Sequence, residues 1–153
     1  MKILQVHNQY RHHGGEEVVV EAEQKMLTDY GHQVEQLIVK SSDIEKAGVL
    51  AKADIALQSI WSFKTYYTVK QQIKNFEPDI VHVHNTVPLI SPSVYSACRD
   101  ANVPVVKTLH SYKLICPGTY LYRDGKICED CLPKSIKYPS AVSYTHLRAH
   151  ETF

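Results

Sequence analysis

The stretch Asp79-Ile80-Val81-His82-Val83-His84-Asn85 decides the fold, because it places a β-branched apolar run between polar ends. β-Branched residues of this kind favour a strand. The segment before it has a helical period, with apolar residues at three- and four-residue steps, and Pro78 ends that helix. The apolar positions of the helix are Tyr66, Val69, Ile73 and Phe76. A strand with an apolar core is therefore predicted at residues 79–84, directly after a helix.

The same alternation extends in both directions from this strand. Further strands are predicted at residues 2–6, 33–39 and 104–109, and residues 44–60 are expected to be helical. A helix that ends at Gly31 has an apolar face formed by Val19, Ala22, Met26, Leu27 and Tyr30. A helix that begins at Ser91-Pro92 has a buried face formed by Val94, Ala97, Cys98 and Ala101. This order predicts an α/β fold with a Rossmann-like, doubly wound, mostly parallel sheet and helices on both faces.

Length and composition restrict the class of protein. The chain has 153 residues, which suits one compact domain, and 17 Lys and Arg against 16 Asp and Glu give a formal net charge of +1. This balance argues against nucleic acid as a partner, because nucleic-acid-binding domains are usually strongly basic. No apolar run resembles a signal peptide or reaches the ~18 residues that suggest a membrane span. We therefore expect a cytoplasmic protein, with peripheral contact to the inner face of a membrane left open.

Three polar clusters follow predicted strands. They are His7-Asn8 with the later Gly14-Gly15, then His84-Asn85, then His110-Ser111. Ligands of doubly wound sheets bind outside the carboxyl ends of the strands, so these residues are expected to gather at one edge of the sheet. The alternative for each histidine is a loop residue that hydrogen-bonds only to the backbone.

Gly14-Gly15-Glu16 opens the first predicted helix and is a candidate anion site, because backbone N–H groups at a helix start favour phosphate. The glycines indicate a tight turn or a close approach of the backbone to something else. Neither a dinucleotide fingerprint nor a P-loop is present. The alternative is a plain turn before an acidic first helical turn, in which Glu16 and Glu17 suit the helix dipole but repel a phosphate.

The cysteines allow two interpretations. In a cytoplasmic protein they are expected to be reduced or metal-bound. Cys116, Cys128 and Cys131 have a spacing that fits three ligands of a structural zinc site, and the alternative is reduced, packed thiols. Prolines between Cys131 and His146 argue against a zinc finger that would use His146 and His150. A small β-hairpin is predicted at residues 120–127, with Asp124-Gly125 as its turn.

Five motifs in register give the chain a specific resemblance. They are 7–10 (His-Asn-Gln-Tyr), 14–17 (Gly-Gly-Glu-Glu), 78–85 (Pro-Asp-Ile-Val-His-Val-His-Asn), 108–112 (Thr-Leu-His-Ser-Tyr) and the run from Cys116-Pro117 to Cys131. Together they resemble the family-4 glycosyltransferases over residues 1–142. One departure is Ser111, where the branch that this chain resembles often has Asn.

The resemblance implies the N-terminal, acceptor-side domain of a two-domain GT-B enzyme. Such an enzyme transfers a sugar with retention from a nucleotide-sugar donor, held mainly by the C-terminal domain, to a glycan or lipid-linked acceptor, as in polysaccharide biosynthesis. Gly14 and Gly15 would face the donor diphosphate, His110 would be the catalytic residue, and His84 and Asn85 would line the acceptor side. The resemblance implies no cofactor and no metal ligand in this site.

Residues 143–153 depart from the family pattern. They resemble translated adaptor sequence, so we expect domain 1–142 to be an incomplete glycosyltransferase domain followed by an unrelated tail; the alternative is a divergent native C-terminus. Two other classes of function stay open at this point. One is a non-catalytic α/β binding module, and the other is a small zinc-stabilised interaction domain.

Overall fold

The computed structural model describes residues 1–9, 14–40, 49–86, 89–112, 115–116 and 118–130. The chain divides into two compact units, Met1–Thr108 and Leu109–Phe153. The proposed tail at 143–153 and Cys131 lie outside the described residues. None of the helices in the described ranges is long and apolar enough to cross a lipid bilayer.

The first unit contains a four-stranded parallel sheet, which confirms the predicted fold class. Its strands are β1 (Lys2–Gln9), β2 (Gln33–Lys40), β3 (Ile80–Val83) and β4 (Val105–Lys107). They lie in the order β2-β1-β3-β4, and each neighbouring pair is parallel. Val6 of β1 lies opposite Leu37 on one side and Val83 on the other. In this order β3, the strand predicted at residues 79–84, lies between β1 and β4 and is an internal strand.

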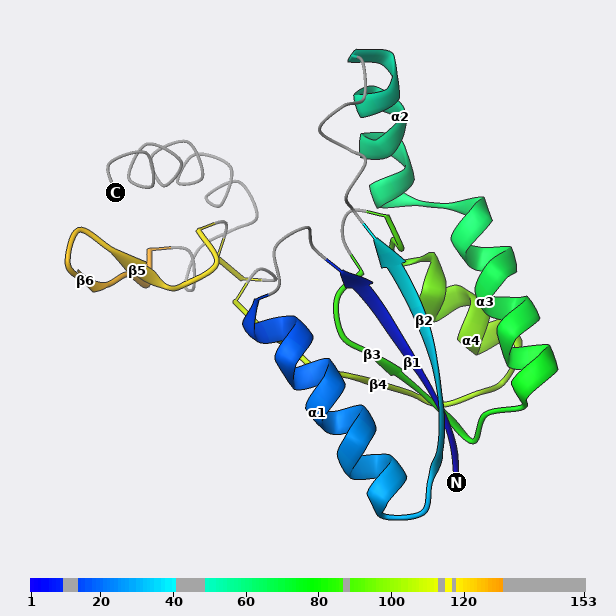
Figure 1. Ribbon diagram of the computed structural model, residues 1–153. Helices are drawn as coiled ribbons and strands as arrows, with labels where there is room; N and C mark the ends of the chain where they lie inside the picture. Colours follow the sequence, from blue (N-terminus) through cyan, green and yellow to red (C-terminus); the bar gives the residue numbers. More distant parts are fainter. Residues whose placement is uncertain (10–13, 41–48, 87–88, 113–114, 117, 131–153) are drawn as a thin grey trace. The chain divides into compact units, whose positions relative to one another are not determined.

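Four helices accompany the sheet: α1 (Gly15–Asp29), α2 (Val49–Ile60), α3 (Phe63–Phe76) and α4 (Ser93–Asp100). The hydroxyl of Ser62 caps α3 by accepting from the Thr65 N–H at 3.2 Å. α3 ends where Glu77 adopts a left-handed φ of 51°, directly before Pro78. α1 lies on one side of the sheet, and α3 and α4 lie on the other, as predicted (Figure 1).

α4 begins later than Ser91-Pro92 suggested. Ser91 has a positive φ of 63° and lies outside the helix, and Pro92 is the N-cap. The Ser91 hydroxyl still accepts a hydrogen bond from the Ser93 N–H at 3.3 Å. Ser91 therefore accepts from the first N–H of α4, although Pro92 and not Ser91 is the N-cap.

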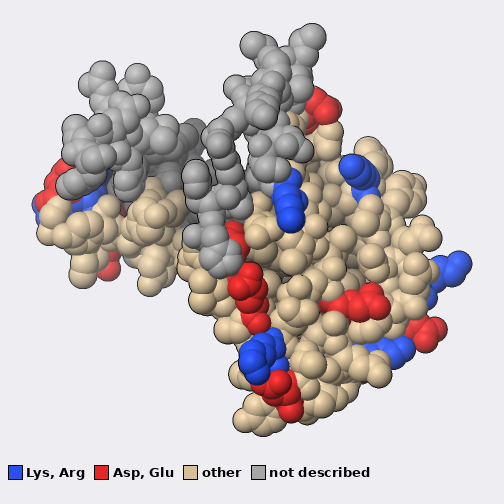
Figure 2. Space-filling model, in the orientation of Figure 1, with Lys and Arg blue, Asp and Glu red and all other residues tan. Residues whose placement is uncertain are grey.

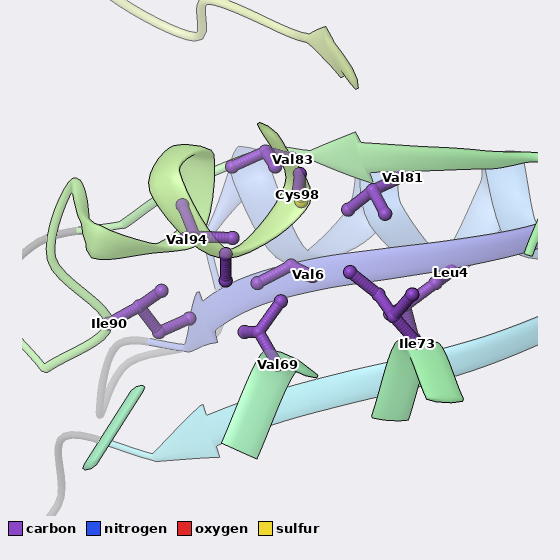
Figure 3. Packing of buried hydrophobic residues seen from close by; sticks show 10 residues of the cluster. Leu4, Val6, Val69, Ile73, Val81, Val83, Ile90, Val94 and Cys98 are labelled. Atoms are coloured by element: carbon purple, nitrogen blue, oxygen red, sulfur yellow. The ribbon is translucent and has the colours of Figure 1, made fainter. Parts of the chain in front are cut away.

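The apolar core lies on the sheet face that α3 and α4 cover (Figure 3). β1 and β3 contribute Leu4, Val6, Val81 and Val83, all with no exposed surface. The two helices cover them with Val69, Ile73, Val94, Ala97 and Cys98. Full burial of one such aliphatic side chain contributes about 1.5–3 kcal/mol, so this layer is the main source of stability in the first unit.

The predicted apolar face of α1 is wrong. Val19, Met26 and Tyr30 are 38%, 49% and 80% exposed, whereas Glu17 and Val20 are buried against the sheet. The reason is the sheet itself. Strand residues alternate between faces, and the face under α1 presents polar side chains of β1 and β3.

The second unit contains the predicted hairpin. β5 (Tyr122–Arg123) and β6 (Lys126–Ile127) pair antiparallel across a two-residue turn. Asp124 and Gly125 both have positive φ, at 52° and 77°. That is the conformation that makes Asp-Gly a preferred hairpin turn.

Cys98 provides a pH-dependent test of the core. Burial raises the pKa of its thiol to about 11, and the side chain has no exposed surface. The protonated thiol is the form that the core tolerates. The contribution of Cys98 to the free energy of unfolding is therefore expected to be fully present below the pKa of this thiol in the unfolded chain. It should fall as the pH rises from there toward 11.

At pH 8 the folded chain should leave Cys98 unmodified by iodoacetamide, while unfolded chain is modified at once, as mass spectrometry of the Cys98 peptide would show. Rapid modification of Cys98 in the folded chain would contradict this burial.

Candidate functional site

The carboxyl ends of β1 and β3 meet at one edge of the sheet. Backbone hydrogen bonds join His84 N–H to Val6 O at 2.9 Å and Asn8 N–H to Asn85 O at 2.8 Å. The Asn8 side chain is buried and accepts from the Leu89 N–H at 3.3 Å. The structure thus brings together the His7-Asn8 and His84-Asn85 clusters, which are far apart in the sequence.

The start of α1 joins the same edge. The Asn85 amide Nδ2 donates to Glu16 Oε2 at 3.2 Å, which ties the end of β3 to the first turn of the helix. Gly14 and Gly15, predicted to bind donor phosphate, directly precede Glu16. The predicted donor-side and acceptor-side clusters are therefore neighbours in this unit.

The helix start already holds one anion, which belongs to the chain. Glu17 is buried and turns back, so that its Oε2 accepts from the Gly14 N–H at 2.8 Å. Its other oxygen lies 3.6 Å from His7 Nε2. This arrangement removes Glu17 from the surface and keeps its carboxylate at the start of α1, where it takes the Gly14 N–H.

Neither Gly14 nor Gly15 has a backbone conformation that favours glycine over other residues. Gly14 has an extended φ of −120°, and Gly15 is the first residue of α1. A Cβ atom built on Gly15 meets no other atom within 4 Å. The tight-turn interpretation is therefore not supported at these positions. Binding of a phosphate by Gly14 and Gly15 stays a prediction.

A layer of buried and half-buried polar side chains lies between α1 and the sheet. Glu23 Oε2 is 3.2 Å from His84 Nε2 and 3.5 Å from His82 Nδ1. The two imidazole rings lie against each other with centroids 4.2 Å apart. His84, predicted to line the acceptor side, thus points its side chain beneath α1, where it is fully buried.

Three members of this layer were not predicted as site residues from the sequence, namely Glu17, Glu23 and His82. Two signals could have identified them. His82 and His84 are two residues apart on a strand, which puts both on one face. Glu17, Val20, Glu23 and Leu27 recur at three- and four-residue steps, and this mixed stripe is less exposed than Val19, Met26 and Tyr30 of the predicted apolar face.

A further missed residue is Lys107, at the end of β4. Its Nζ donates to the backbone carbonyl of His84 at 2.9 Å and lies 6.0 Å from the centre of the Tyr95 ring. It brings a positive charge to the carboxyl edge of the sheet. α1 is by contrast strongly acidic, with five acidic residues and one lysine, and Figure 2 shows acidic side chains along it.

His110, the predicted catalytic residue, lies at the start of the second unit, where it is half-buried. Its predicted clustering with Gly14, Gly15 and His84 stays a prediction. The cysteines of the second unit are described in part. Cys116 and Cys128 are buried free thiols, so a zinc site that also uses Cys131 stays untested.

Comparison with known protein families gives a match that covers most of this chain. A family model described as Glycosyltransferase Family 4 matches residues 13–142. The matched range contains Gly14, Gly15, His84, Asn85 and His110. No curated protein and no solved structure matches the chain.

Proposed function

The chain belongs to glycosyltransferase family 4, and we propose that it forms the acceptor-side half of a retaining, nucleotide-sugar-dependent glycosyltransferase. In this proposal a second domain of a GT-B enzyme holds most of the donor nucleotide. The acceptor is a glycan or a lipid-linked glycan, and the reaction takes place in the cytoplasm.

The observation that carries the proposal is the start of α1. It lies at the carboxyl edge of a parallel sheet, where ligands of such folds bind. It begins with Gly14 and Gly15, and among the described residues no side chain or distant backbone atom lies within 4 Å of a Cβ atom built on Gly15. Backbone N–H groups at a helix start favour phosphate oxygens. We assign Gly14 and Gly15 to the donor diphosphate on this basis.

The other roles follow from position. The Asn85 side chain is hydrogen-bonded to Glu16, next to the two glycines. This position, where the two clusters meet, is suitable for contact with the acceptor. The His84 side chain lies beneath α1, where Glu23 contacts its ring, and Lys107 donates to its backbone carbonyl. In this proposal His84 therefore positions the end of β3 and affects the acceptor side indirectly. His110 is assigned to the transferred sugar, where an imidazole positions the donor and stabilises charge as the bond to the diphosphate breaks.

Gly15→Ala, in an enzyme that contains both halves, tests the phosphate assignment. Alanine is a better helix former than glycine and meets no neighbour here, so stability should be unchanged or rise by up to about 1 kcal/mol. The added methyl group blocks close approach of a diphosphate. Loss of one or two hydrogen bonds, each worth about 0.5–1.5 kcal/mol, should lower kcat/KM for the donor roughly 10-fold.

Gly31→Ala is the matched control for this substitution. Gly31 ends α1 at its opposite end with a φ of +82°, so the control should lower the melting temperature and leave kcat/KM for the donor unchanged. Unchanged donor kinetics for Gly15→Ala would remove the assignment.

A further inference from the structure

We propose that Glu23, His82 and His84 form a binding site for a divalent transition-metal ion, best suited to Zn²⁺, which fastens α1 to the sheet. The three residues offer one ligand atom each, and these atoms lie within 4.8 Å of one another. They come from two elements that are distant in sequence, α1 and the end of β3. The proposal concerns a structural site and is independent of the sugar-transfer proposal.

The spacing of the ligand atoms fits a tetrahedral ion. Zinc bonds to nitrogen and oxygen of about 2.0–2.1 Å put the ligands of a tetrahedron about 3.3 Å apart. Glu23 Oε2 lies 3.2 Å from His84 Nε2 and 3.5 Å from His82 Nδ1, so two edges of that tetrahedron are already in place. Two imidazoles and one carboxylate are also a donor set that zinc takes in proteins.

The surroundings of His82 orient it as a ligand. Its second ring nitrogen, Nε2, lies 2.8 Å from Thr108 Oγ1. A histidine that binds a metal through one nitrogen typically donates the N–H of the other to an oxygen acceptor, which fixes the tautomer and the ring plane. The Thr108 hydroxyl provides that acceptor, and it leaves His82 Nδ1 to face Glu23.

The Glu23 carboxylate gives independent support. Its Oε2 is shielded from solvent, yet among the described residues no hydrogen bond to this oxygen has suitable geometry. A buried carboxylate oxygen without a hydrogen bond is strongly unfavourable. A cation between this oxygen and the two rings removes that penalty, whereas contacts at 3.2 and 3.5 Å with poor hydrogen-bond direction do so only in part.

The site explains why α1 turns a charged stripe toward the sheet. Its apolar residues Val19, Met26 and Tyr30 are exposed, so they contribute little hydrophobic packing between α1 and the sheet. Figure 1 shows α1 running along the sheet on the side opposite to α3 and α4, where the apolar core lies. A metal ion bound by α1 and β3 would replace hydrophobic packing on this side.

The test uses the full chain, stripped with a chelator and titrated with Co²⁺ and then Zn²⁺. One equivalent of Co²⁺ should bind with a tetrahedral visible spectrum that lacks a thiolate charge-transfer band, and Zn²⁺ should displace it and raise the melting temperature. Glu23→Gln should weaken this binding at least about 100-fold, and Thr108→Val about 10-fold.

The control is Glu21→Gln, the same change on the exposed side of α1 two residues earlier. It should bind Co²⁺ as the unaltered chain does. Circular dichroism of each metal-free variant establishes that it is folded. Equal Co²⁺ affinity of the Glu23 and Glu21 variants, a spectrum that reports thiolate ligands alone, or no change in melting temperature with Zn²⁺ would each overturn the proposal. In that case Glu23 is a hydrogen-bond acceptor for the two imidazoles and nothing more.

Discussion

Purified by itself, this chain is expected to release no nucleotide and to modify no acceptor when it is given nucleotide sugars. Transfer requires donor and acceptor in one closed cleft, where orientation supplies much of the rate enhancement. The leaving diphosphate also needs donors that are already in place. In the described part of the chain, the start of α1 offers it backbone N–H groups beside Glu16.

The hydrogen bonds at the start of α1 are too weak to account for catalysis. One or two backbone hydrogen bonds contribute about 0.5–1.5 kcal/mol each. An enzyme must lower its barrier by about 8 kcal/mol or more. Lys107, a cation at this edge, is hydrogen-bonded to the His84 carbonyl, and α1 adds negative charge. We therefore expect His110 and the donor-binding domain of the proposed enzyme to supply most of the remaining stabilisation.

The control is the same chain joined to the donor-binding domain of a family-4 glycosyltransferase, which should show turnover. In that enzyme His110→Ala should lower kcat about 10²–10³-fold, as loss of one charge-stabilising donor does, with an unchanged melting temperature. Sustained turnover by the isolated chain would contradict the half-site proposal. Near-normal turnover of the His110 variant would contradict the role of that residue alone.

Val81→Asp is expected to abolish cooperative folding of the first unit. Val81 has no exposed surface and packs in the apolar layer between β3 and the helices α3 and α4. The substitution removes aliphatic packing and buries a carboxylate without a partner. The penalty of several kcal/mol for such a charge is comparable with the total stability of about 5–15 kcal/mol of a typical domain. Circular dichroism and urea titration measure the loss.

Val106→Asp is the matched control on the neighbouring strand. It makes the same chemical change, but Val106 is 48% exposed on β4, where a carboxylate remains hydrated. Its unfolding midpoint should move by an amount typical of surface substitutions, about 0.5 kcal/mol. Similar losses for the two variants would show that β3 is not the internal strand of the sheet.

The exposed apolar stripe of α1 has a consequence for sequence interpretation. Apolar periodicity located the helix and its end at Gly31, but it selected the wrong face. Periodicity reports which residues share a face, and burial depends on what lies opposite that face. Opposite α1 lie Gln5, His7 and the histidines of β3, so the polar stripe packs inward.

The sequence by itself determined the parallel α/β fold, the strand positions, the hairpin at Asp124-Gly125 and the glycines at the start of α1. These features depend on local periodicity, on turn chemistry and on the general rule that strands joined by helices run parallel. Only the tertiary structure decided that Glu23 meets His82 and His84, that Glu17 turns inward, and that Asn85 bonds to Glu16. Such contacts depend on register and helix rotation, which are set by packing between elements that no local pattern relates.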